Sequence, residues 1–154
     1  MLDLSHSLLA VAYTLLLVAT LPKIASSELS WALVPGWLMM VGYSASILKS
    51  LARDEKQSKK LAKVVWLAWV IYYALAIIWP LPMHWYDSLV VLSLLLMPDN
   101  MTGSALMAVY YLCSAAEYMH QQDALQVAAR AILTVVVTIE SAQQARRALQ
   151  ARAA

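Results

Sequence analysis

Two ionisable residues lie within apolar stretches of the chain, where a charge is costly, and they are the first candidates for chemistry. Glu117 and Arg130 stand on either side of a short polar link, residues 120–123, that separates two apolar segments. An unpaired arginine in hydrocarbon costs several kcal/mol even on lenient insertion scales. If the two segments are antiparallel helices, the long arginine side chain can reach back to the carboxylate. The sequence therefore predicts an intramembrane Glu117–Arg130 pair; the alternative is an arginine that extends to the outer headgroups and pairs with nothing.

A polar line at helical spacing runs along the second of these segments. At about 100° per residue its members fall within an arc of about 120°. They are Asp123, Gln126, Arg130, Thr134, Thr138 and Ser141. On the preceding segment Tyr110 and Ser114 share a face with Glu117, and we expect Ser114, Gln126 and Thr134 to surround the pair. Asp123 is a second candidate partner for Arg130.

The polar line has two interpretations, a conducting path and structural hydrogen bonding. A proton or ion route needs several ionisable groups at mid-depth, and this part of the line holds only Thr134 and Thr138. Both hydroxyls can bond a preceding carbonyl or a neighbouring helix. The sequence favours a structural role.

The remaining chemistry-bearing residues give weak signals. His84 and His120 are predicted at the outer ends of their helices, where a pair of histidines could ligate a haem or another metal. No small residues beside them make room for a porphyrin, so no cofactor is predicted. The single cysteine, Cys113, excludes an internal disulfide and a multi-cysteine metal site. The chain has no phosphate-binding glycine loop, HExxH or CxxC pattern, and nothing specific indicates an enzyme.

Composition indicates where these residues lie. The chain has 154 residues, of which 62% are hydrophobic and 13% charged, whereas a soluble domain is about half apolar and a quarter charged. This predicts an all-α, polytopic transmembrane helical bundle that forms one domain. The start has no basic residue before its apolar run, so we expect the first helix to be retained rather than cleaved. The net charge of +2 does not suggest a nucleic-acid partner.

Six spans are predicted, at about residues 4–21, 35–53, 64–79, 82–97, 101–119 and 123–140. The fourth is the weakest, because its residues rise only about 24 Å against a hydrocarbon core of about 30 Å. A re-entrant segment, and hence five spans, is the alternative.

Basic residues set the expected orientation. Six of them lie in the segment 49–63: Lys49, Arg53, Lys56, Lys59, Lys60 and Lys63. By the positive-inside rule this segment is a cytoplasmic loop, and the tail 141–154, with three arginines, is a cytoplasmic helix. Together they hold nine of the eleven Lys and Arg residues, which favours six spans with both termini cytoplasmic, in a bacterial inner membrane. The loop could also attract anionic lipid headgroups, but a topology signal is the simpler interpretation.

A line of small residues, Gly42, Ser46 and Ser50, would let another helix approach closely. We therefore expect a non-enzymatic membrane subunit that packs with partner membrane proteins, or with copies of itself, through this seam and the polar faces. The alternative is a holin-like protein whose polar faces meet in an oligomer to line a pore. A carrier of a small substrate is disfavoured, because only three glycines are available to interrupt its helices.

Overall fold

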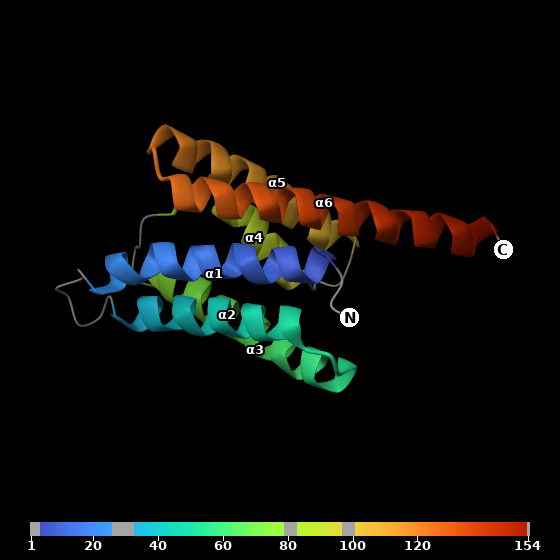
Figure 1. The fold of residues 1–154 in the computed structure, drawn as a ribbon, viewed down its shortest axis with the longest axis horizontal. Helices are drawn as coiled ribbons and strands as arrows, with labels where there is room; N and C mark the ends of the chain where they lie inside the picture. Colours follow the sequence, from blue (N-terminus) through green and yellow to red (C-terminus); the bar gives the residue numbers. More distant parts are fainter. Residues whose placement is uncertain (1–3, 26–32, 79–82, 97–100, 154) are drawn as a thin grey trace.

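The computed structural model describes residues 4–25, 33–78, 83–96 and 101–153. All regular structure in these residues is α-helical, as Figure 1 shows. The six helices are α1 (Leu4–Ala25), α2 (Leu33–Leu51), α3 (Glu55–Ile78), α4 (Asp87–Leu95), α5 (Met101–His120) and α6 (Ala124–Ala153). The prediction of a helical bundle is confirmed.

Neighbours along the chain are also neighbours in space. Each helix packs against the next, and α1 also packs against α6, so that α1 lies between α2 and α6 (Figure 1). The smallest of these contacts joins α3 to α4. The start of α1, the corner between α2 and α3, and the C-terminal end of α6 therefore lie toward the same end of the bundle (Figure 1).

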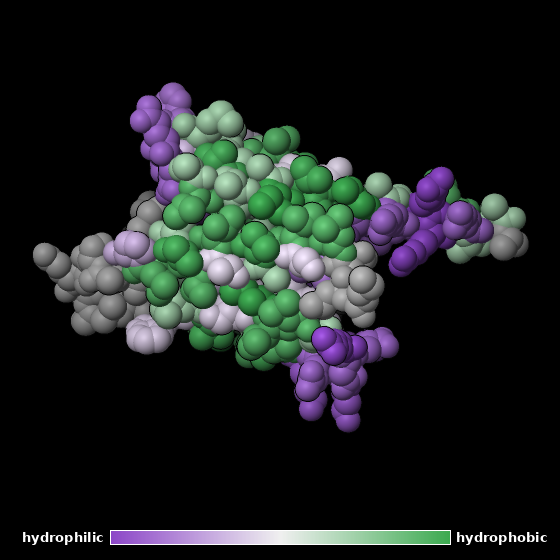
Figure 2. Space-filling model, in the orientation of Figure 1, coloured by the Kyte–Doolittle hydropathy of each residue, from purple (hydrophilic) through white to green (hydrophobic). Residues whose placement is uncertain are grey.

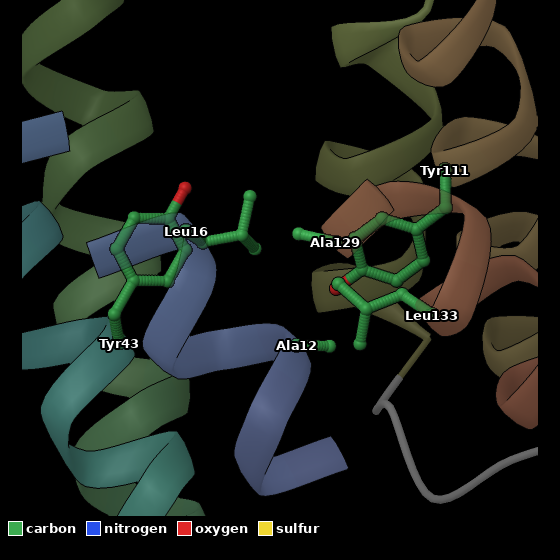
Figure 3. Packing of buried hydrophobic residues seen from close by; sticks show 6 residues of the cluster. All are labelled: Ala12, Leu16, Tyr43, Tyr111, Ala129 and Leu133. Atoms are coloured by element: carbon green, nitrogen blue, oxygen red, sulfur yellow. The ribbon is translucent and has the colours of Figure 1, made fainter. Parts of the chain in front are cut away.

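The core between these helices is built from small and large apolar residues in alternation. Ala12 and Leu16 of α1 meet Ala129 and Leu133 of α6, and each of the four is at most 1% exposed (Figure 3). Tyr43 of α2 and Tyr111 of α5 complete the cluster. The two alanines bring α1 and α6 close together, which fixes the rotation of α6 about its axis and so the direction of its polar line.

Three helices, α1, α3 and α6, are long and apolar enough to span a membrane. The helices α2 and α5, of 19 and 20 residues, are not among them. The six-span prediction is therefore not confirmed by length and composition.

The predicted fourth span differs most from the structure. Helix α4 has nine residues, a rise of about 14 Å, which is less than half of a hydrocarbon core. It begins at Asp87, whose Oδ2 accepts a hydrogen bond from the backbone N–H of His84 at 2.7 Å. The outermost positions of the predicted span, 82 and 97, lie outside the described residues.

The basic segment 49–63 is mostly helical, which corrects the prediction of a loop. Helix α2 continues to Leu51 and α3 begins at Glu55, so four of the lysines stand on the first turns of α3. Asp54 accepts a hydrogen bond on Oδ1 from the N–H of Lys56 at 3.0 Å, as a helix N-cap does. Lys59 Nζ lies 3.1 Å from Glu55 Oε1, an exposed i, i+4 pair. These local bonds explain why the helix starts so early.

The surface in Figure 2 is apolar in the middle and hydrophilic at its ends. Hydrophilic residues gather at the turn between α5 and α6, at the corner between α2 and α3, and along the end of α6. Large apolar side chains face outward from several helices, among them Val18, Leu67, Leu112 and Val135, each about half exposed. Soluble proteins rarely expose so much contiguous apolar surface.

Candidate functional site around Arg130

The turn between α5 and α6 positions the polar line. Gln122 has a φ of +59°, and the N–H of Asp123 donates to the carbonyl of Tyr118 at 3.1 Å, the pattern of a Schellman C-cap. Asp123 then caps α6, because its Oδ1 lies 3.4 Å from the N–H of Gln126. The helix predicted to begin at this aspartate does so, and Arg130 lies about two turns into it.

Arg130 is buried among neutral oxygens. Its side chain is 5% exposed, and that of Gln126 is 2% exposed. The guanidinium Nε donates to Gln126 Oε1 at 3.1 Å. Its Nη1 donates to Ser114 Oγ at 2.9 Å and to the hydroxyl oxygen of Tyr110 at 3.3 Å. The structure thus brings together four residues of the predicted polar faces.

Tyrosine rings complete the surroundings of the guanidinium. The ring of Tyr118 lies with its centroid 4.6 Å from Arg130 Cζ, and that of Tyr110 lies 5.7 Å away. Both distances fit cation–π attraction, which is stronger where water is excluded. Tyr110 also contacts Tyr86 of the segment before α4, with ring centroids 5.7 Å apart. We call Gln126, Ser114, Tyr110 and Tyr118 the arginine cage.

No ion pair joins Glu117 to Arg130 in the part of the chain that the structure describes. Glu117 instead accepts a hydrogen bond on Oε1 from Gln121 Nε2 at 3.4 Å. It lines an open surface hollow of about 400 Å³ with Trp85, Tyr86, Cys113, Ala116 and His120. The reason is the course of the arginine side chain: it lies against the deeper residues Ser114 and Tyr110 of α5, where oxygens accept its hydrogen bonds. It does not extend to the surface either.

Farther along α6, the threonine hydroxyls of the polar line form hydrogen bonds within the helix itself. Thr134 Oγ1 donates to the carbonyl of Arg130 at 2.7 Å, and Thr138 Oγ1 donates to the carbonyl of Thr134 at 2.6 Å. Thr138 is exposed and Ser141 is half-buried. The two threonine hydroxyls are therefore bonded to their own helix.

The seam of small residues on α2, formed by Gly42, Ser46 and Ser50, is buried within the molecule and packs against α3. A Cβ added at Gly42 would stand 2.9 Å from Trp69 Cε2 of α3, so the indole occupies the space that the glycine leaves. Ser46 and Ser50 are 4% and 5% exposed, and each donates its hydroxyl to the carbonyl four residues earlier. A partner helix at this seam would have to displace α3.

The two histidines have separate surroundings. His84 stacks on Tyr86, with ring centroids 5.0 Å apart, and His120 lines the hollow beside Glu117. No group of three or more His, Cys, Asp or Glu side chains in the described residues is placed to hold a metal ion.

Apart from Tyr110, the buried tyrosines near the site are what sequence reasoning missed. Tyr43, Tyr73 and Tyr86 are each 6–7% exposed and come from α2, α3 and the start of α4. Tyr118 stands over the guanidinium, although it was not placed on the predicted polar face. One signal was in the composition: the chain has eight tyrosines and no phenylalanine, so its aromatic rings are mainly ones that carry a polar group.

Comparison with protein-family models, curated proteins and solved structures finds no match for this chain. The interpretation of the site therefore depends on its own geometry.

Proposed function

We propose that the chain is a non-enzymatic integral membrane subunit of the bacterial inner membrane that associates laterally with a partner membrane protein or a second copy. The apolar belt of Figure 2 supports a membrane location, because it separates two hydrophilic ends. In a membrane, lipid acyl chains would cover the exposed apolar side chains and keep them away from water.

A six-crossing topology with both termini cytoplasmic agrees with the order of the helices. Successive helices alternate in direction, and the basic α2–α3 corner lies toward the same end as the arginine-bearing end of α6 (Figure 1). In this topology α4 crosses only part of the bilayer as helix, while the other helices cross it more fully. The basic end faces the cytoplasm and its anionic lipid headgroups.

The small residues on the outward face of α6 are the main support for lateral association. Ala124, Ala128 and Ala131 are all exposed on it. The outward face of α3 instead presents bulky side chains, such as Leu67 and Ile71. Small residues on a membrane helix let a second helix approach closely, so that van der Waals contacts and backbone dipoles hold the two together. The proposed interface is therefore on α6 and replaces the Gly42 seam, which α3 already covers.

A channel through one copy is not what this geometry favours. Thr134 and Thr138 donate to carbonyls of their own helix, and Arg130 is enclosed by its cage. Neither arrangement lines a continuous polar path.

In-cell photocrosslinking tests the proposal. A photoreactive amino acid replaces Ala131 on α6 in one variant and Ala74, an exposed alanine of α3, in a matched control. We expect a discrete adduct from position 131 and only lipid labelling from position 74, with the mass of the adduct identifying a partner or a second copy. Equal, diffuse labelling from both positions would contradict a helix interface on α6.

A further inference from the structure

A second hollow lies between the start of α1 and the second half of α6. Its volume is about 300 Å³. Polar and charged side chains line it: Ser5, His6, Glu140, Gln143, Gln144 and Arg147. The start of α1 and the C-terminal end of α6 lie toward the same end of the bundle as the basic α2–α3 corner (Figure 1). In the proposed topology the hollow therefore lies toward the cytoplasmic headgroups.

Two side chains of α6 bring unused acceptors to this hollow. Gln144 Oε1 is buried and accepts no hydrogen bond, and it is the only such side-chain atom among the described residues. Glu140, one turn earlier on the same helix face, is half-buried and forms no ion pair with any described residue. His6 and Lys49 attract its carboxylate only from a distance. A buried acceptor without a donor is costly, so this oxygen points to a ligand that donates to it.

The chemistry of the lining indicates a group with both charges. The carboxylate of Glu140 attracts a cation, and the carbonyl oxygen of Gln144 selects a cation that can donate a hydrogen bond. Side chains four residues apart on a helix are neighbours, so one ammonium group can donate to both. Arg147, exposed and about one turn farther along, adds a guanidinium at the rim, which is well suited to a phosphate.

We propose that this hollow binds a phosphoethanolamine group, with its primary ammonium at Glu140 and Gln144 and its phosphate at Arg147. A choline headgroup carries the same charges but no N–H bond, so it would leave Gln144 Oε1 without a donor. Water would satisfy that oxygen without distinguishing the two headgroups. The site rests on the membrane location in the proposed function, but not on lateral association through α6.

Thermal unfolding of the purified full chain in a maltoside detergent tests this preference. Two phospholipids with identical acyl chains are compared, one with an ethanolamine and one with a choline headgroup. The same headgroups without acyl chains, glycerophosphoethanolamine and glycerophosphocholine, form a second pair at constant ionic strength. We expect a saturable rise of the midpoint that is larger for ethanolamine by about 3 °C or more. A preference in the lipid pair alone assigns the ligand to the bilayer, and one in both pairs shows that the free headgroup suffices.

Two substitutions inside the hollow test the ammonium contacts. Glu140→Gln should abolish the preference for ethanolamine, while Glu117→Gln, at a half-buried carboxylate of the other hollow, should keep it. Gln144→Leu replaces the unpartnered amide with an apolar side chain of similar size. It should not lower the midpoint in choline lipid, and it should reduce the difference between the headgroups by at least about half. Gln150→Leu, at an exposed position, should leave that difference unchanged.

An exposed substitution keeps the test decisive if the variants at Glu140 and Gln144 do not fold. Arg147→Gln should raise the ethanolamine-lipid concentration for half-maximal stabilisation about tenfold, because a charge-assisted contact to phosphate is lost. Arg146→Gln, at an exposed arginine that does not line the hollow, should change it by less than about twofold.

Equal midpoints with ethanolamine and choline in both pairs would overturn the proposal. So would a preference for ethanolamine that survives both Glu140→Gln and Arg147→Gln. The membrane location is checked separately, by alkaline extraction of cell membranes, which does not depend on the headgroup. Release of the chain by that treatment would contradict the proposed function, whereas retention without a headgroup preference would contradict this site alone.

Discussion

At the scale of single residues, Arg130 shows how this bundle retains a charge in its interior. Ser114 and Tyr110 of α5 and Gln126 of α6 each accept from it, and a tyrosine ring covers it. Hydrogen bonds to a charged group are about twice as strong as neutral ones and are costly to lose in a buried place. The cage residues should therefore be coupled in energy.

Ser114→Ala should lower the free energy of unfolding by about 2 kcal/mol. The substitution removes the closest acceptor of Nη1, at 2.9 Å, and leaves a buried N–H without it. Denaturant titration in mild detergent measures the change. Ser88→Ala is the control, because that hydroxyl bonds the carbonyl of Trp85 from an exposed position, and it should change stability by less than about 0.5 kcal/mol. Equal effects of the two substitutions would argue against a stabilising hydrogen bond between Ser114 and the buried guanidinium.

Gly42→Ala should destabilise the bundle by about 1–3 kcal/mol, because the new methyl group would stand 2.9 Å from Trp69 Cε2. The same titration measures it. In a Trp69→Leu background the indole is gone, so the cost of Gly42→Ala should fall by at least half. An unchanged cost would mean that the glycine is needed for its backbone rather than for its contact with the indole.

At the scale of elements, the helix ends decide which side chains meet. The break between α5 and α6 at residues 121–123 sets the depth of Arg130 relative to α5 and so places it beside Ser114 and Tyr110. Likewise, because α3 begins at Glu55, four lysines lie on its first turns, which extend beyond the apolar belt. A shift of either end by one residue would rotate the following helix by about 100°.

Gln122→Gly should stabilise the protein by about 1 kcal/mol. Gln122 has a φ of +59°, which costs a residue with a Cβ about that much and glycine almost nothing. Gln121→Gly, one residue earlier, is the matched control and should be neutral or destabilising, since its backbone is not in the left-handed region. Thermal unfolding of both variants measures the difference; a loss of stability on Gln122→Gly would contradict the described turn.

Sequence patterns predicted some of these features, and their limits are physical. The α5–α6 break was predictable, because a capping aspartate and a chain too long for one span both require it. Ser114 and Gln126 beside Arg130 followed from helical periodicity. No Glu117–Arg130 ion pair is present among the described residues, since periodicity gives the face of a helix but not which turn a long, flexible side chain selects. The length of α4 and the placing of Trp69 on Gly42 depend on contacts between helices that no local pattern encodes.

At the scale of the whole molecule, a ring of helices with its basic residues at one end has a definite expected orientation. Residues of the α2–α3 corner and of the end of α6 should share one side of the membrane, and the α5–α6 turn should lie on the other. The count of crossings follows from these sides, because α1 to α3 and α5 to α6 alone would leave the end of α6 on the opposite side from the corner. Measuring on which side these residues lie therefore tests whether the partly helical segment around α4 crosses the membrane.

Labelling of single cysteines with a membrane-impermeant maleimide measures these sides directly. Cys113→Ala removes the native thiol, and single cysteines are then placed by Ser58→Cys in the corner, Gln121→Cys in the α5–α6 turn and Gln150→Cys near the end of α6. We expect Gln121→Cys to react in intact cells, and Ser58→Cys and Gln150→Cys to react only after permeabilisation, because the positive-inside rule holds the basic end in the cytoplasm. Opposite behaviour of Ser58→Cys and Gln150→Cys would mean that α4 and its flanking residues do not cross. Reaction at all three positions in intact cells would contradict the proposed membrane topology as a whole.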